Sequence, residues 1–238
     1  MIHPYYSDDA VTLYLGDCRE LLPDLRADVV LTDPPYNCGK NYGETTDDNL
    51  PWPEWCAWFD DVLTLCKGSA PNVFAFLSQT AAKKYERLGS HERDWALVWH
   101  KPLSLSICAS PFMPHWEPIF YWGKQKRLKS TDGGALWGSD VLACNVETGK
   151  ANRWDHPTPK PLSLMLELVG KFDGRILDPF AGSGATLAAC KQLGRACVGV
   201  EISEAYCERI ARRLEVTAVG VRGVSDQWPL DLSAGEVA

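Results

Sequence analysis

The chain has 238 residues, of which 45% are hydrophobic, and its formal net charge at pH 7 is -7. This size is enough for one complete α/β core and short for two, so we expect a single domain over residues 1–238. The negative charge argues against a protein that holds nucleic acid through phosphate contacts over its whole surface, so any contact with DNA must be local.

Seven short apolar runs, rich in β-branched and aromatic residues, predict buried strands. They cover residues 11–16, 28–33, 72–78, 95–100, 117–123, 175–178 and 196–202. Helical patterns lie between several of them, at residues 53–66, 79–88, 162–172, 185–193 and 204–214. This alternation predicts an α/β fold in three layers, with a seven-stranded, mostly parallel sheet covered by helices on both faces.

The predicted strand at residues 28–33 leads into a short loop that contains Asp33, Pro34, Pro35 and Tyr36. The two adjacent prolines fix the backbone φ angle and push Asp33 out of the helical region, so the loop is rigid and extended. Sheets of this type bind ligands at the carboxyl ends of their strands. We therefore expect this loop to have a function.

The chemistry that suits the loop is methylation of an arylamine nitrogen, whose lone pair is delocalised into the ring and is a poor nucleophile. The Asp33 carboxylate and the Pro34 carbonyl would each accept one N–H of the amino group, which aims the lone pair at the methyl group. Tyr36 would stack on the base. A base inside a duplex is out of reach, so we expect it to be flipped out. The alternative is an ordinary Pro-Pro turn with Tyr36 in the core.

Three stretches, at residues 37–52, 103–115 and 125–159, show neither the strand pattern nor the helix pattern. Loops this long in a compact domain more often have a function than not. Residues 124–129 and 153–154, within or next to the third stretch, carry basic and aromatic side chains suited to local contacts with DNA. The candidates are Lys124, Lys126, Arg127, Lys129, Arg153 and Trp154. The alternative is a solvated charged loop.

The predicted strand at residues 175–178 is followed by the loop DPFAGSGAT, at residues 178–186, and then by a helical pattern. Gly182 and Gly184 allow the backbone to turn tightly and to approach a ligand at the helix N-terminus. Glu201 ends the next strand, at about the spacing where Rossmann-like sites place the acid that binds ribose hydroxyls. These features predict a nucleoside-containing cofactor.

This spacing fits a nicotinamide cofactor as well, but two observations favour S-adenosylmethionine. The Asp178 carboxylate would repel a pyrophosphate and attract the ammonium of a methionyl group. Leu187 stands where the dinucleotide fingerprint has its third glycine. S-Adenosylmethionine carries one ribose, no phosphate and a sulfonium, so it suits the loop better. The remaining alternative is that Asp178 and Glu201 only cap turns.

Taken together, these residues resemble the DNA amino-methyltransferases, in the permuted group whose Asp-Pro-Pro-Tyr motif precedes the cofactor motif. The resemblance covers residues 13–214 and implies a Rossmann-like S-adenosylmethionine-dependent methyltransferase fold with a circularly permuted motif order. It implies that residues 33–36 are catalytic and that the substrate is double-stranded DNA. The short insert at residues 125–155 corresponds to the region to which this group usually assigns target recognition. It contains Trp137 and Trp154, and either is a candidate to stack on a base or wedge into the duplex, with ordinary hydrophobic packing as the alternative.

The resemblance also assigns the cofactor contacts. Gly16 and Asp17 match a Gly-Asp pair that implies contact with the cofactor's adenine, and Lys160, in a His-Pro-Thr-Pro-Lys-Pro segment, matches a residue near the methionyl end. Pro159 replaces the Gln of the family motif, so any side-chain contact there is lost. The implied cofactor-binding residues are Asp17, Cys18, Asp33, Lys160, Asp178, Phe180, Gly182, Ser183, Gly184, Thr186, Glu201 and Ile202.

Adenine N6 is the expected target, because Asp33 stands where the cytosine-N4 enzymes of the family more often have Ser. N4-cytosine methylation is the nearest alternative, and RNA or protein substrates and a non-catalytic DNA-binding relative stay open. A nicotinamide-dependent oxidoreductase leaves the loop at residues 33–36 unexplained. Methylation at C5 of cytosine needs a covalent cysteine, normally after a proline, and the sequence contains no Pro-Cys pair.

The remaining expectations concern the protein's surroundings. The nine cysteines form no CxxC pair, so we expect reduced thiols and no metal site. No apolar stretch approaches a membrane span, so we expect a cytoplasmic enzyme, of the kind found in restriction-modification systems. Related enzymes commonly form homodimers, and Trp52, Trp55 and Trp58 fit either an interface or, at helical spacing, core packing.

Overall fold

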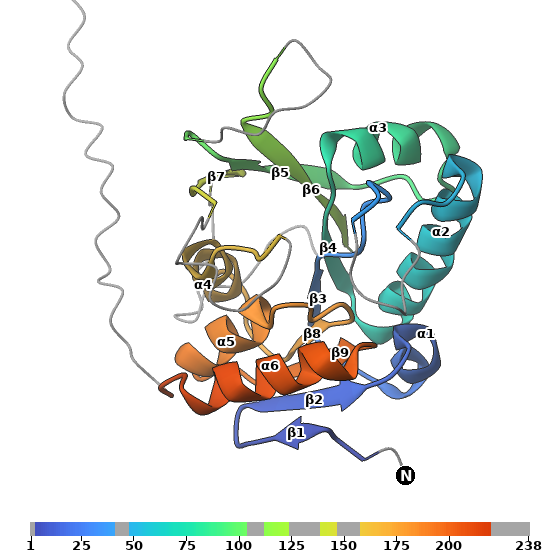
Figure 1. Cartoon of the computed structure of the whole chain (residues 1–238). Helices are drawn as coiled ribbons and strands as arrows, with labels where there is room; N and C mark the ends of the chain where they lie inside the picture. Colours follow the sequence, from blue (N-terminus) through green and yellow to red (C-terminus); the bar gives the residue numbers. More distant parts are fainter. Residues whose placement is uncertain (1–2, 41–47, 104–111, 124–138, 147–157, 220–238) are drawn as a thin grey trace, which may run out of the picture.

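The fold of the computed structural model centres on one nine-stranded sheet (Figure 1). The structure describes residues 3–40, 48–103, 112–123, 139–146 and 158–219. The strand order in the sheet is β1-β2-β9-β8-β3-β4-β6-β5-β7. The strands are β1 (Tyr6–Ser7), β2 (Val11–Leu15), β3 (Val29–Thr32), β4 (Asn72–Phe76), β5 (Trp95–His100), β6 (Trp116–Gly123), β7 (Val141–Ala143), β8 (Ile176–Asp178) and β9 (Cys197–Glu201).

Helices cover the sheet on both faces, α4, α5 and α6 on one side and α1, α2 and α3 on the other (Figure 1). They are α1 (Cys18–Leu21), α2 (Trp52–Ser69), α3 (Gln79–Leu88), α4 (Leu162–Gly170), α5 (Ala185–Gln192) and α6 (Glu204–Glu215), with a 3-10 turn, η1 (Leu22–Asp24), after α1. No helix within the described ranges is long and apolar enough to cross a membrane. The predicted three-layer arrangement is confirmed.

The sheet has nine strands and not the predicted seven. The seven predicted strands all form, and β1 and β7 are additional. β1 has two residues and β7 has three, which is too short for an alternating pattern to show in the sequence. β7 lies within the insert predicted at residues 125–155 and pairs in parallel with β5 at the sheet edge, so part of this insert extends the sheet.

The centre of the sheet is parallel, as predicted. β2, β9, β8, β3 and β4 pair in parallel, whereas β6 runs antiparallel to both β4 and β5. All four residues of β3 are buried, and they alternate between the two faces. Val29 and Leu31 pack toward α4 and α5, and Val30 packs toward α2. Burial on both faces explains why this strand reads as a continuous apolar run in the sequence.

The aromatic residues of α2 fill the core on its side of the sheet. Trp55 is 2% exposed and its ring stacks on that of Phe59 at 5.4 Å between centroids. Phe59 in turn meets Tyr85 of α3 edge-on at 4.9 Å. Trp55 therefore serves core packing, as its helical spacing with Trp52 and Trp58 indicated.

The topology places the ends of three strands at one edge of the sheet. β9, β8 and β3 are adjacent and parallel, so Glu201, Asp178 and Thr32 end their strands side by side. Thr32 and Asp178 are far apart in sequence, yet the Thr32 hydroxyl donates a hydrogen bond to the Asp178 carboxylate at 3.0 Å. The two predicted motifs therefore meet in space.

Candidate active site

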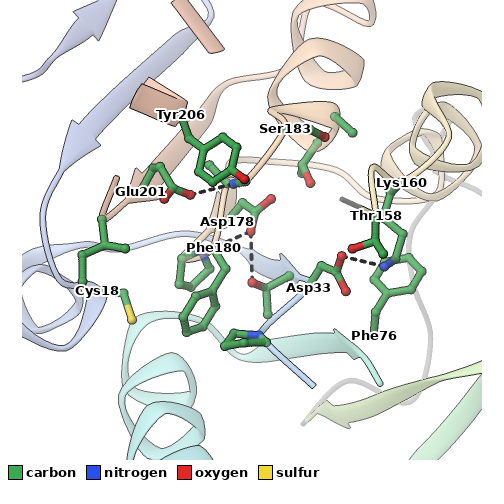
Figure 2. A pocket seen from close by; sticks show the side chains of 18 of the residues that line it. Cys18, Asp33, Phe76, Thr158, Lys160, Asp178, Phe180, Ser183, Glu201 and Tyr206 are labelled. Carbon is green, nitrogen blue, oxygen red and sulfur yellow. Dashed lines mark hydrogen bonds and ion pairs between the residues drawn. The ribbon is translucent and has the colours of Figure 1, made fainter. Parts of the chain in front are cut away.

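A cavity of about 300 Å³ opens at the carboxyl ends of these strands (Figure 2). Both motifs contribute to its walls, Asp33 and Pro35 from one and residues 178–183 from the other. Of the predicted cofactor-binding residues, eleven line it: Asp17, Cys18, Asp33, Lys160, Asp178, Phe180, Gly182, Ser183, Thr186, Glu201 and Ile202. Gly184 is not part of the lining and instead forms the N-cap of α5.

The glycine loop is held by a hydrogen bond from its backbone to the side chain of Glu201, which ends β9. Gly182 and Gly184 adopt left-handed φ angles of 51° and 73°, which side chains rarely tolerate. The Gly182 N–H donates to one Glu201 carboxylate oxygen at 2.8 Å, and the Ser203 N–H donates to the other at 2.9 Å. Burial raises the pKa of Glu201. Each of its oxygens keeps a lone pair for a ligand hydroxyl, so it caps the loop and can also bind a ribose.

Asp178 lines the cavity between Asp33 and Glu201 (Figure 2) and is 2% exposed. Its carboxylate accepts hydrogen bonds from the Thr32 hydroxyl at 3.0 Å and the Phe180 N–H at 3.2 Å. Burial raises its pKa to about 6, and these hydrogen bonds only partly oppose that rise. A carboxylate in this position is poorly solvated, so a cationic ligand group would stabilise it.

Asp17 and Cys18 lie where β2 leads into α1. The Asp17 carboxylate caps α1 by accepting from the Arg19 N–H at 2.9 Å, and the Arg19 guanidinium lies 2.6 Å from it. The Arg19 hydrogen bond is the main reason that the pKa of Asp17 is lowered. Burial raises the pKa of the Cys18 thiol to about 12, so it is neutral and gives the cavity an apolar surface. Both residues thus border the cavity, and Asp17 also has a structural role in capping α1.

Asp33 forms the centre of a small polar cluster at the opposite end of the cavity. Lys160 Nζ lies 2.6 Å from Asp33 Oδ2 and 3.0 Å from the Tyr36 hydroxyl, which itself donates to Asp33 Oδ1. The Tyr36 hydroxyl thus helps to fix the carboxylate, and the stacking of its ring on a base stays a prediction. The indole N–H of Trp55 donates to the Pro35 carbonyl at 3.1 Å and anchors the loop.

The chain after Tyr36 is organised by a buried carboxylate that the sequence does not reveal. Asp48 accepts hydrogen bonds from the backbone N–H groups of Asn37, Cys38 and Lys40. Asn37 adopts a left-handed φ of 58°, and its side-chain amide pairs with the backbone of Leu50 at 2.7 and 2.8 Å. Asp48 sits in a polar stretch without periodicity, so no sequence signal distinguishes it from solvent-exposed acids.

Three further charged residues near the site were missed by sequence reasoning. Lys101 directly follows β5, and its Nζ lies 2.6 Å from Glu117 Oε1 of β6. Glu117 Oε2 lies 4.0 Å from Lys160 Nζ. Arg213 of α6 is 3% exposed and donates to the Ser183 carbonyl at 2.8 Å, which ties the glycine loop to that helix. A charged residue inside the apolar run at residues 117–123 was the available signal for Glu117.

The predicted DNA-contacting residues do not fall in the part of the chain that the structure describes. They are Lys124, Lys126, Arg127, Lys129, Arg153 and Trp154. Their assignment stays a prediction from the sequence. The insert at residues 125–155 is described only over residues 139–146, which include β7.

Comparison with protein families and curated proteins gives a consistent result. A family model described as DNA methylase matches residues 27–213. The Type II methyltransferase M.HpaI of Haemophilus parainfluenzae is 27% identical over 243 residues, which cover 87% of this chain and 74% of that protein. DNA adenine methyltransferase YhdJ of Escherichia coli (strain K12) is 24% identical over 254 residues, which cover 90% and 85% respectively.

Solved structures share the fold. The PvuII DNA methyltransferase, described as cytosine-N4-specific, matches with a TM-score of 0.68 and 17% identity over 88% of each chain. The structure of an M1.HpyAVI–SAM complex matches with a TM-score of 0.58 and 23% identity, over 85% of this chain and 99% of that one. These similarities confirm the predicted methyltransferase fold.

Proposed function

Because the chain belongs to the DNA methylase family of amino-methyltransferases, we propose that it transfers a methyl group from S-adenosylmethionine to N6 of adenine in DNA. The observation that carries this proposal is the shared cavity at the ends of β3 and β8. Asp33, suited to an amino group, and Asp178, suited to a cation, face one space of about 300 Å³. A donor and an acceptor of the methyl group can therefore meet there.

S-Adenosylmethionine is the cofactor of this family, and the residues of the cavity fit it. The buried Asp178 would pair with the methionyl ammonium, and Glu201 would accept from the ribose hydroxyls. Cys18, Phe180 and Ile202 offer apolar contacts for the adenine ring. When bound, the cofactor supplies a methyl group on a sulfonium. Among the described residues, the charged side chains near Asp178 are carboxylates, which would repel phosphate groups. The site therefore suits a cofactor without phosphates.

The catalytic loop would activate the target amine by accepting its protons. The Asp33 carboxylate is fixed by Lys160 and Tyr36, and Trp55 fixes the adjacent Pro35 carbonyl. Asp33 and the Pro34 carbonyl would each accept one N–H, so that the nitrogen lone pair points toward the methyl carbon. The amine would then gain the methyl group in place of one of its protons, and that proton would leave to water.

Double-stranded DNA is the proposed substrate, with the target base flipped out of the helix. The reacting end of the cavity is lined by the buried side chains of Thr32 on β3 and Phe76 on β4, so a stacked base would not reach Asp33. With a net charge of -7, the protein would hold DNA through local contacts. The basic residues predicted for this are those of residues 124–129 and 153–154.

N4 of cytosine is the alternative target, because both bases carry the same type of exocyclic amine. A cytosine-N4-specific enzyme shares the fold, at 17% identity. Asp33 at the first position of the catalytic motif favours adenine, and the relative YhdJ is named as an adenine methyltransferase. The alternative therefore has support from the fold alone.

The test is to incubate the purified protein with labelled S-adenosylmethionine and unmethylated DNA, and to identify the product by nucleoside digestion and mass spectrometry. N6-methyladenine supports the proposal, and mapping of the methylated positions gives the recognised sequence. N4-methylcytosine would assign the alternative. Cofactor binding without transfer to DNA would overturn the proposal and point to RNA or protein substrates.

A further inference from the structure

The side chain of Lys160 lies next to the catalytic carboxylate and faces the same cavity (Figure 2). It is 7% exposed, and its Nζ atom lies 2.6 Å from Asp33 Oδ2. The cavity wall thus presents a hydrogen-bond acceptor and a hydrogen-bond donor side by side. The proposed mechanism uses only the acceptor.

The surroundings of Lys160 hold its ammonium in place. Glu117 Oε2 is buried, has no hydrogen-bond partner among the described residues, and lies 4.0 Å from Lys160 Nζ. The other oxygen of Glu117 pairs with Lys101 at 2.6 Å, which fixes the Glu117 side chain. The ring centroids of Phe76 and Trp99 lie 5.1 and 5.7 Å from Nζ. Two carboxylates and two aromatic faces therefore stabilise a positive charge at this position.

Both groups keep hydrogen-bonding capacity for a ligand. A carboxylate offers about four lone-pair sites, and Asp33 uses two of them, for Lys160 and Tyr36. An ammonium has three N–H groups, and Lys160 uses two, for Asp33 and the Tyr36 hydroxyl. Glu117 is too distant to accept the third. An incoming base can therefore meet a free lone pair of Asp33 and the third N–H of Lys160, which lie on neighbouring atoms.

We propose that Lys160 donates its third N–H to the ring nitrogen beside the target amino group, so that Asp33 and Lys160 together recognise the amidine edge of the base. This inference rests on the proposed function. The ring nitrogen is N1 in adenine and N3 in cytosine, and in both it is bonded to the carbon that carries the amine. The Asp33 carboxylate would accept from the amine, and the Lys160 ammonium would donate to the ring nitrogen. This pairing excludes bases that carry an N–H at that ring nitrogen, such as guanine and thymine.

The contact also directs the methyl group to the amine. The ring nitrogen has its lone pair in the ring plane, whereas the lone pair of the amine is delocalised, so the ring nitrogen is the better nucleophile. A hydrogen bond from Lys160 occupies that lone pair and leaves the amine to react. Lys160 is thus a specificity-determining residue of the base pocket, and Glu117 is a positioning residue that acts through it.

The test compares two substrate oligonucleotides, carrying adenine or 1-deazaadenine at the methylation site mapped for the wild-type protein. The analogue keeps the amine and replaces only the ring nitrogen by C–H; 3-deazacytosine serves if the target is cytosine. The wild-type protein should lose at least about tenfold in kcat/KM on the analogue, as expected for a hydrogen bond to a charged group. Lys160→Met should be slower on adenine and should treat both oligonucleotides alike.

Two controls separate this role from others. Lys191→Met removes a buried ammonium that is 7% exposed, like Lys160, but does not line the cavity and has no contact with Glu117, so this variant should keep the tenfold discrimination. Weaker pairing of the analogue in the duplex affects every variant equally, so the ratio between variants isolates the ring contact. Calorimetry should give similar cofactor Kd values for the wild-type protein and Lys160→Met.

Three results would overturn the inference. They are equal kcat/KM of the wild-type protein on both oligonucleotides, discrimination that persists in Lys160→Met, and a large loss of cofactor binding in that variant, which would assign Lys160 to the methionyl carboxylate. In each of these the proposed function stands. If the wild-type protein transfers no methyl group to unmodified DNA, the proposed function fails and this inference fails with it.

Discussion

Asp178→Asn is expected to stabilise the ligand-free protein at pH 8. Burial raises the pKa of Asp178 from 3.8 to about 6, so at pH 8 the folded protein keeps a poorly solvated charge that the unfolded chain solvates well. A shift of about two pKa units corresponds to roughly 3 kcal/mol. Asparagine keeps an acceptor for Thr32 and Phe180, and some hydrogen-bond strength is lost, so the net gain should be about 1–3 kcal/mol.

The pH dependence identifies the cause. A raised carboxyl pKa stabilises the folded state below pH 4, and that contribution is lost as the pH rises through about 6. The advantage of Asp178→Asn in urea unfolding should therefore be full at pH 8, smaller at pH 6 and absent near pH 4. A difference that does not change with pH, or a variant less stable than the wild-type protein at pH 8, would refute the reasoning.

Asp8→Asn is the matched control with the opposite sign. Burial alone would raise the pKa of Asp8, but hydrogen bonds from Lys191 and the Val11 and Ala10 N–H groups outweigh it and lower the pKa to about 2. Its charge stabilises the fold above pH 4, and that contribution is lost as the pH falls through about 2. Asp8→Asn should therefore be less stable than the wild-type protein at pH 8, by about 2 kcal/mol.

Three further substitutions test other parts of the molecule. Asp33→Ala should lower the methyl-transfer rate by at least about 100-fold and leave the cofactor Kd from calorimetry nearly unchanged; undiminished turnover would contradict the mechanism. Gly182→Val should prevent cofactor binding in the same assay, because φ is 51° there and the N–H bonds Glu201. Lys191→Met leaves the partly buried Asp8 carboxylate without its ion-pair partner and should reduce the free energy of unfolding in urea by about 1–2 kcal/mol; a loss below about 0.5 kcal/mol would show that the pair is dispensable.

Much of the fold was predictable because buried strands and amphipathic helices leave a periodic pattern. β3 and β4 are buried on both faces and read as continuous apolar runs, and α2 repeats its aromatic residues at helical spacing. The elements that escaped prediction are short. α1 has four residues, and β7 forms only because β5 offers it a free edge, which is a tertiary effect.

In the candidate site too, some residues could be predicted from the sequence and others could not. Residues in compact motifs, such as Asp33 and Asp178, were identified because turn chemistry and strand ends mark them in the sequence. Lys160 was identified as well, as a cofactor contact, which stays a prediction; its pairing with Asp33 is a finding of the structure that the sequence did not indicate. Its second neighbour, Glu117, comes from a different strand, and no local pattern indicates that contact. Pairings between distant segments depend on topology, which spacing does not encode.

The order of strands has a consequence for how the protein is made. β8 and β9, from the C-terminal part of the chain, insert between β2 and β3, from the N-terminal part. During synthesis β2 and β3 would therefore emerge without the two strands that separate them in the sheet, and their facing edges would stay unpaired until β8 and β9 are made. A nascent chain would display Asp33 long before it could hold a methyl donor. Methylation should thus begin only on completed chains, and cutting the protein between β7 and α4 should give two inactive pieces that regain activity only together.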